Sequence, residues 1–170
     1  MIAATSKHAY IDCDPVKCVG CQLCEYICSF TKDNEYNSYR SRIRTVRVDE
    51  VLITAIACRT CENAPCVTVC PRDAMTQDPL TGIIHVDAMR CDGCAWCMEA
   101  CDFGAITINP TKKLAEICDL CETLPEGPQC VKWCPKEALE LTTPDQRAQK
   151  IRRELISESL EIPTKAKDPK

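Results

Sequence analysis

Short stretches of alternating apolar and polar residues recur along this chain and predict short β-strands. The longest stretch lies between Arg42 and Ile56 and predicts a strand or a hairpin. Its apolar positions are Ile43, Val46, Val48, Val51 and Ile53. Three briefer runs, at 83–86, 106–108 and 139–141, predict single strands. Together with the helix described next, these strands indicate the α+β class.

The last thirty residues have a different pattern and predict one helix. Thr143-Pro144-Asp145-Gln146 is a typical helix start, with threonine at the N-cap and proline at the first helical position. The helix is expected to end near Leu160, within a segment bounded at 142–162. Its broad apolar stripe predicts either packing on its own domain or contact with another subunit or a second copy. The charged tail, 163–170, is expected to be disordered.

Composition leaves little material for an ordinary core. Hydrophobic residues make up 45% of the chain, but 17 of the 170 residues are cysteine and aromatics are only 5%. Metal coordination can supply the missing cohesion, because ligand binding is then coupled to folding. We therefore expect the metal-free chain to be largely unfolded.

Sixteen cysteines fall into four groups of four. The groups are Cys18-Cys21-Cys24-Cys28, Cys58-Cys61-Cys66-Cys70, Cys91-Cys94-Cys97-Cys101 and Cys118-Cys121-Cys130-Cys134. In the first and third, the spacing is Cys-x2-Cys-x2-Cys-x3-Cys, which places three thiolates on three corners of a [4Fe–4S] cubane. The fourth cysteine of such a run is the ligand of the other cluster in two-cluster ferredoxins. Four [4Fe–4S] clusters are thus predicted, and they indicate one-electron transfer.

Zinc and disulfides are the alternatives. Zinc sites usually use two Cys-x2-Cys knuckles, which the second and fourth groups resemble but the first and third do not. A secreted disulfide scaffold disagrees with the odd cysteine count, the tight local triplets and an N-terminus without the pattern of a signal peptide. The remaining cysteine, Cys13, occupies a strand position and is predicted to be a buried small side chain, not a ligand.

Two internal repeats support an iron–sulfur fold. Residues 11–21 align with 84–94, and each copy ends in Cys-x-Gly-Cys. Residues 70–75 and 134–139 form a second pair, with 101–106 as a looser copy. Gly20 and Gly93 are expected to let the loop backbone approach the cluster closely. These are the parts of a bacterial ferredoxin fold, used twice.

Several function classes are disfavoured. The formal charge is −4, and each cluster with its thiolates adds about −2, so the loaded protein should not bind nucleic acid. No run approaches the roughly 18 apolar residues of a membrane span. The chain contains no Gly-x-Gly-x-x-Gly motif, so no flavin or nicotinamide site is expected here. We expect a cytoplasmic, anaerobic setting and no catalytic residues.

The segment from Cys58 to Pro71, with Cys118-Asp119-Leu120-Cys121, resembles a known family. It is similar to the four-cluster ferredoxin-type subunits of dimethyl-sulfoxide-reductase-like complexes, formate dehydrogenase beta subunits and the ferredoxin-like partners of carbon monoxide dehydrogenase. The resemblance covers about residues 11–141 and implies two tandem ferredoxin-like modules in a domain at 1–141. The first and fourth cysteine groups form one module, and the second and third form the other.

The resemblance also implies how the cysteines are shared among the clusters. Cluster I takes Cys18, Cys21, Cys24 and Cys134. Cluster II takes Cys28, Cys118, Cys121 and Cys130. Cluster III takes Cys58, Cys61, Cys66 and Cys101. Cluster IV takes Cys70, Cys91, Cys94 and Cys97.

Partners follow from the same resemblance. The chain is interpreted as the electron-transfer subunit of an oxidoreductase, relaying electrons between a catalytic subunit and a flavin/NAD subunit or soluble acceptor. Its compact size resembles the iron–sulfur subunits of tungsten- or molybdenum-pterin aldehyde oxidoreductases, so that partner is favoured. Two other hypotheses stay open: a freely diffusing polyferredoxin, and a scaffold that self-associates through its C-terminal helix and chains clusters between copies.

Overall fold

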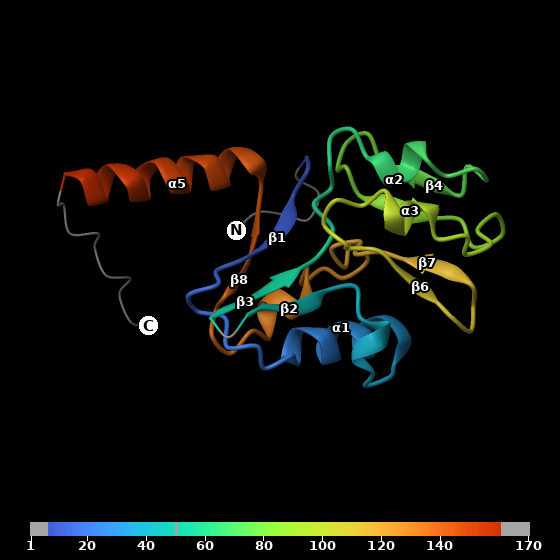
Figure 1. Ribbon diagram of the computed structural model, residues 1–170, viewed down its shortest axis with the longest axis horizontal. Helices are drawn as coiled ribbons and strands as arrows, with labels where there is room; N and C mark the ends of the chain where they lie inside the picture. The colour runs from blue at the N-terminus through green and yellow to red at the C-terminus, as the bar shows by residue number, and fades with distance from the viewer. Residues whose placement is uncertain (1–6, 50, 161–170) are drawn as a thin grey trace.

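A computed structural model describes residues 7–49 and 51–160 of the chain (Figure 1). Its helices are α1 (Leu23–Asp33), the 3-10 turn η1 (Ser38–Arg40), α2 (Pro65–Thr68), α3 (Trp96–Glu99), α4 (Gln129–Lys132) and α5 (Pro144–Ser159). Its strands are β1 (Tyr10–Cys13), β2 (Arg44–Val48), β3 (Leu52–Ile56), β4 (Met75–Gln77), β5 (Ile84–Val86), β6 (Thr107–Asn109), β7 (Leu114–Glu116) and β8 (Leu139–Thr142). The α+β class predicted from the sequence is confirmed.

Within the described residues, the strands form four separate antiparallel pairs. These are β1–β8, β2–β3, β4–β5 and β6–β7. The hairpin expected between Arg42 and Ile56 is β2–β3, and the expected strands at 83–86, 106–108 and 139–141 are β5, β6 and β8. The sequence analysis missed β4 and β7, whose sequences Met-Thr-Gln and Leu-Ala-Glu lack the β-branched apolar residues found in β5 and β6.

The β1–β8 pair joins the two ends of the cysteine-rich region. Ile11 lies opposite Leu141, and Cys13 lies opposite Leu139. On the same side of the molecule α1 packs against α4, while α2 packs against α3 in a second group of elements with β4 (Figure 1). The first cysteine group therefore lies beside the fourth, and the second beside the third.

The core is small and rich in sulfur. Its largest fully buried apolar side chains include Ile11, Ile43, Ile83, Ile106 and Leu120. One continuous cluster of buried residues contains these side chains together with many cysteines. A core of this kind depends on whatever binds the cysteines, as the low aromatic content suggests.

Helix α5 extends away from this body, as Figure 1 shows. The predicted N-cap is present, with the backbone N–H of Gln146 donating to Thr143 Oγ1 at 3.4 Å. Its apolar residues Ile151, Leu155, Ile156 and Leu160 are 40–61% exposed, so the stripe is not buried by the described part of the chain. The helix segment was predicted to end at 162, and its last two residues, like the tail at 163–170, lie outside the described residues.

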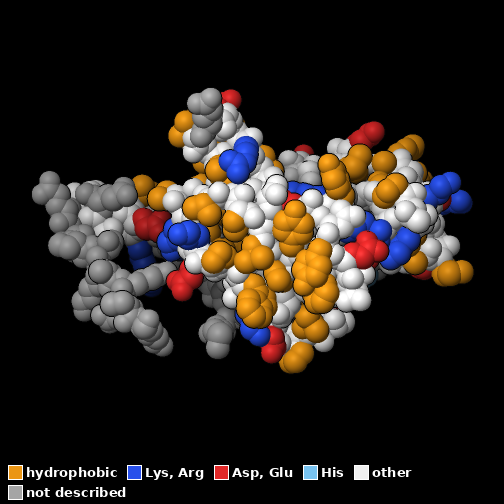
Figure 2. Space-filling model, turned by 90° about the horizontal axis from the view of Figure 1, so that it is seen from below, with side chains coloured by type: hydrophobic (Ala, Val, Ile, Leu, Met, Phe, Trp, Pro, Cys, Tyr) orange, Lys and Arg blue, Asp and Glu red, His pale blue; other side chains and the backbone are white. Residues whose placement is uncertain are grey.

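A second apolar surface lies on α1 and the turn that follows it. Tyr26 and Phe30 on α1 are 38% and 42% exposed, and Tyr36 and Tyr39 are 69% and 84% exposed. The Phe30 and Tyr36 rings stack with their centroids 4.7 Å apart. Figure 2 shows the hydrophobic side chains that gather on the face seen from below. No helix of the described residues has the length and apolarity needed to cross a membrane.

Candidate metal centres

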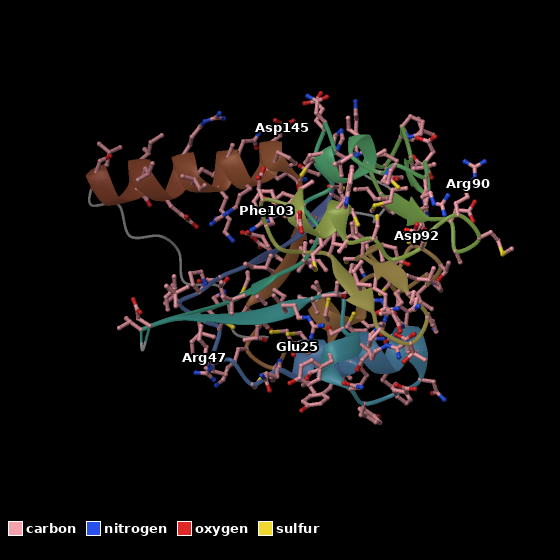
Figure 3. All side chains as sticks on the ribbon, turned by 45° about the vertical axis from the view of Figure 1, so that its right-hand side comes forward. Glu25, Arg47, Arg90, Asp92, Phe103 and Asp145 are labelled. Atoms are coloured by element: carbon pink, nitrogen blue, oxygen red, sulfur yellow. The ribbon has the colours of Figure 1, made fainter. Side chains whose placement is uncertain are left out.

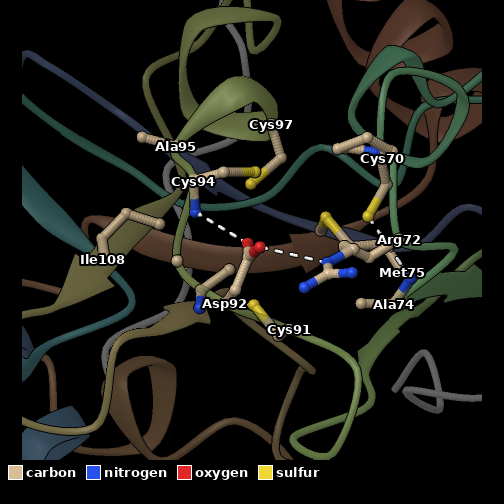
Figure 4. A pocket seen from close by; sticks show the side chains of 13 residues that line it. Cys70, Arg72, Ala74, Met75, Cys91, Asp92, Cys94, Ala95, Cys97 and Ile108 are labelled. Carbon is tan, nitrogen blue, oxygen red and sulfur yellow. Dashed lines mark hydrogen bonds and ion pairs between the residues drawn. The ribbon is translucent and has the colours of Figure 1, made fainter.

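Three cavities are each lined by one of the predicted sets of four cysteines. One contains Cys18, Cys21, Cys24 and Cys134 in its wall. A second contains Cys28, Cys118, Cys121 and Cys130. The third contains Cys70, Cys91, Cys94 and Cys97, drawn in Figure 4. Each wall takes its sulfurs from distant parts of the chain, because the β and α pairings bring those segments together.

The structure also brings the fourth set together, namely Cys58, Cys61, Cys66 and Cys101. Burial first, and then negative charge on Cys66, Cys61 and Cys101, raises the pKa of Cys58 to about 12. Burial likewise raises the pKa of Cys66 to about 11, with Cys101 as the main charged neighbour. All four sulfurs of this set therefore lie within electrostatic range of one another.

Three thiols of the other sets show the same burial effect. Burial raises the pKa of Cys24 to about 12, and it raises the pKa values of Cys118 and Cys130 well above the usual range. These thiols hold their protons at neutral pH until a metal replaces them. A buried thiol without that replacement is only a small apolar side chain.

Backbone N–H groups point at several of the sulfurs. Within the second repeat, the amide four residues after a cysteine donates to its sulfur in every copy. The pairs are Ala74 to Cys70 at 3.3 Å, Ala105 to Cys101 at 3.4 Å and Ala138 to Cys134 at 3.3 Å. Such bonds stabilise a thiolate and adjust the potential of a bound cluster. The repeat's alanine was visible in the sequence, but its donor role was not inferred there.

The same turn requires a left-handed residue just before that alanine. Asp73, Gly104 and Glu137 occupy equivalent positions with φ of 48°, 58° and 47°. The chain thereby reverses and aims the following N–H back at the sulfur. Glycine reaches this conformation at little cost, whereas aspartate and glutamate reach it with some strain.

Gly20 and Gly93 also have a packing role. Both have positive φ. A Cβ on Gly93 would lie 2.7 Å from the backbone oxygen of Lys113, and one on Gly20 would lie 2.8 Å from Arg47 Nη2. Each glycine therefore allows a covering segment to lie directly on the cysteine loop.

The donor set fits a multi-iron cluster. In the described residues, no three His, Cys, Asp or Glu side chains are placed to hold a single metal ion. Four sulfurs around a cavity that do not converge on one point suit a cubane, in which each thiolate binds a different iron. This geometry does not fit a tetrahedral zinc site. The Cys13 thiol is buried on β1 and lines none of the three cavities.

Comparison with known proteins defines the class. The model of the 4Fe–4S dicluster domain family matches residues 49–143. The chain is 40% identical over 142 residues to the putative electron transport protein YsaA of Escherichia coli K12, covering 78% of this chain and 88% of that protein. It is 34% identical to the thiosulfate reductase electron transfer subunit PhsB of Salmonella typhi, covering 78% and 74%. The electron transport protein HydN of E. coli K12 is 33% identical, with 78% and 86% covered.

The fold and the cysteine-lined sites thus define a ferredoxin-type electron-transfer protein. The chain belongs to the 4Fe–4S dicluster domain family. It binds [4Fe–4S] clusters and serves as a non-catalytic electron-transfer component of oxidoreductases.

Proposed function

We propose that the chain carries four [4Fe–4S] clusters in two tandem ferredoxin-like modules. The ligand sets are those that line the cavities, with Cys58, Cys61, Cys66 and Cys101 as the remaining set. The observation that carries the proposal is that distant segments supply each wall, and that each wall holds four sulfurs. The clusters supply the electron-carrying chemistry when bound, and the chain positions them and tunes their potentials.

The modules lie in the domain at 1–141, with the helix segment 142–162 and the tail 163–170 as additions. The first and fourth cysteine groups belong to one module, and the second and third belong to the other. The β1–β8 pair and the α1–α4 contact support the first, and the α2–α3 contact supports the second.

We number the four cysteine sites I to IV after the clusters that they are predicted to hold. Burial supports a linear order of sites I, II, III and IV. Cys21 of site I and Cys94 of site IV are exposed, whereas all four cysteines of site II are buried. The pKa of Cys118 in site II is raised first by burial and also by charge on Cys58 of site III, so these two sites are neighbours. Arg47 beside Gly20 and Arg90 beside Cys91 lie on opposite sides of the molecule (Figure 3). Electrons then enter at one exposed end and leave at the other.

The proposed partner is a catalytic oxidoreductase subunit, with a tungsten- or molybdenum-pterin type favoured, and a flavin/NAD subunit or soluble carrier as acceptor. The relative PhsB is an electron transfer subunit of a thiosulfate reductase, which supports a fixed catalytic partner. The apolar face on α1 offers a surface of the kind that protein partners cover. A cytoplasmic, anaerobic location suits thiolate ligands that oxygen would damage.

Metal analysis tests the cluster count. Anaerobically isolated protein should contain about sixteen iron and sixteen sulfide per chain, four of each per cubane. Protein that is colourless, or that carries zinc, would contradict the proposal. Destroying one interior site should stop electron transfer between the two ends while leaving substrate binding by the partner intact.

A free polyferredoxin is the second candidate, since YsaA and HydN are described only as electron transport proteins. Anaerobic pull-down from native cells separates the two. Catalytic subunits that stay bound at high salt contradict the free carrier, whereas isolation as a lone chain contradicts the fixed subunit.

A cluster-chaining scaffold is the third candidate, and the exposed stripe of α5 favours it. Removing 143–170 should then lower the oligomeric mass in solution. An unchanged mass would contradict this role for the helix.

A further inference from the structure

Arg59 lies between the first two cysteines of site III, and its charged side chain is 28% exposed. Its guanidinium carbon is 4.6 Å from the centre of the Tyr10 ring and 5.7 Å from that of Phe103. Its Nε is buried and has no hydrogen-bond partner among the described residues. The two rings hold the positive charge in place and shield it from water.

One carboxylate offsets this charge, and it is shared with α5. Asp12 on β1 is only 9% exposed. Its Oδ1 accepts from Arg59 Nη1 at 3.2 Å, and its Oδ2 pairs with Arg147 Nε at 2.8 Å. A single buried negative charge therefore lies between a cation of site III and a cation of the C-terminal helix.

The charges of this triad reach the neighbouring groups. The pKa of Tyr10 is raised, chiefly by burial and then by Asp12, while Arg59 and Arg147 both lower it. Arg147 is therefore electrostatically connected to the surroundings of site III although it belongs to the projecting helix.

We propose that the triad Arg59–Asp12–Arg147 sets the reduction potential of site III and makes that potential depend on how α5 is held. Arg59 favours the reduced state, which carries one more negative charge, and Asp12 opposes it. Arg147 neutralises Asp12 and thereby leaves the Arg59 charge effective. A partner that draws α5 away from β1 lowers the potential of this interior site and slows electron flow through it.

The inference rests on the proposed ligand set of site III, and Arg59 acts here as a positioning and tuning residue. The electron that reduces this site comes from the adjacent site, which is oxidised in the same step. No atom is gained or lost in this step. The triad changes only the equilibrium distribution of the electron between site III and the adjacent site.

The test is a redox titration of the loaded protein, followed by electron paramagnetic resonance, in Arg59→Gln, Arg59→Lys, Arg147→Gln and Asp12→Asn. At a fixed ambient potential, Arg147→Gln should lower the ratio of reduced to oxidised cluster about threefold to tenfold. Tenfold corresponds to about 59 mV for one electron. Arg59→Gln should lower the ratio more, Arg59→Lys less, and Asp12→Asn should raise it.

Two controls separate this effect from structural damage. Arg152→Gln removes a charge of the same sign from an exposed position on α5 and should change nothing. Arg72→Gln removes a charge that lines the cavity of site IV, so it should shift the reduction potential of site IV and not that of site III. In the double variant Asp12→Asn/Arg147→Gln, the Arg147→Gln change should have a smaller effect than in the parent protein, because the ion pair that holds Arg147 at β1 is already weakened.

The possible failures are distinguishable. The spectra should contain the signals of all four clusters. If Arg147→Gln then shifts none of their reduction potentials, or shifts them equally in the parent protein and in Asp12→Asn, the triad has no tuning role. If iron analysis and spectra instead show that the cluster of site III is absent from the parent protein, the cluster assignment itself fails.

Discussion

Cys13 and Cys18 lie in different surroundings. Cys13 is 7% exposed in a strand whose four residues are all buried, and its position follows from the β1–β8 register. Cys18, five residues later, lines a cavity with three other thiols. We therefore propose Cys18 as a cluster ligand and Cys13 as a buried small side chain.

We expect Cys13→Ala to keep the iron content of the parent protein. The matched change Cys18→Ala should remove one cluster, about four iron per chain, because one corner loses its thiolate. Anaerobic iron and sulfide analysis measures both. Equal iron loss in the two variants would show that Cys13 is a ligand.

The raised thiol pKa values predict how cluster binding depends on pH. The pKa values of Cys24 and Cys58 are raised to about 12, so these thiols are protonated in the metal-free protein at neutral pH. Each must release its proton when iron binds, so cluster affinity should rise with increasing pH and fall with acidification. Titrating the loaded protein with a chelator at several pH values measures this, with slower iron loss expected at the higher pH. An affinity independent of pH would contradict the prediction.

At the scale of elements, short loops and two-residue turns define the sites more than regular structure does. Helices α2, α3 and α4 each span four residues. Each presents one cysteine from a single turn: Cys66, Cys97 or Cys130. The stability of the protein should therefore depend on how closely other backbone segments pack on these loops.

Gly93→Ala should destabilise the protein more than Gly104→Ala. Both glycines have positive φ, so the conformational strain of alanine, about 1–2 kcal/mol, is common to the pair. Only at Gly93 does the added Cβ meet a backbone atom at 2.7 Å, whereas nothing lies within 4 Å at Gly104. Thermal loss of the cluster absorbance, followed anaerobically, compares them. A lower midpoint for Gly104→Ala would contradict the assigned role of the Lys113 segment.

At the scale of the whole molecule, a buried ionic network joins the two groups of elements. Asp33 at the end of α1 pairs with Arg40 at 3.3 Å and with Arg42. Glu116 on β7 pairs with Arg42 at 3.4 Å and with Arg40 at 3.6 Å. These side chains are 6–14% exposed. The network also borders site II, because the backbone N–H of Arg42 donates to Cys28 Sγ at 3.3 Å.

Arg42→Ala should destabilise the loaded protein by about 2–3 kcal/mol. This is below the ~3–5 kcal/mol of a fully broken buried pair, because Arg40 and Lys112 still pair with Asp33. Lys150→Ala removes an exposed pair with Glu140 and should cost less than ~1 kcal/mol. Anaerobic thermal melts of both variants provide the comparison. Equal midpoints would show that the network does not hold the groups together.

The sequence by itself determined the chemistry of this protein. The spacing of the sixteen cysteines, the repeats around them and the alternation at 42–56 were enough to predict the class, most strands and the start of α5. These signals are local, since a cysteine loop, a turn and a helix cap each depend on a few adjacent residues.

Only the tertiary structure decided what surrounds each site. The Arg59–Asp12–Arg147 triad, the network of Asp33 and Glu116, and the cavity walls of the sites join residues far apart in the chain. Hydrogen bonds and charge pairs of this kind depend on distances in space, and alternation and spacing along a single chain do not record them.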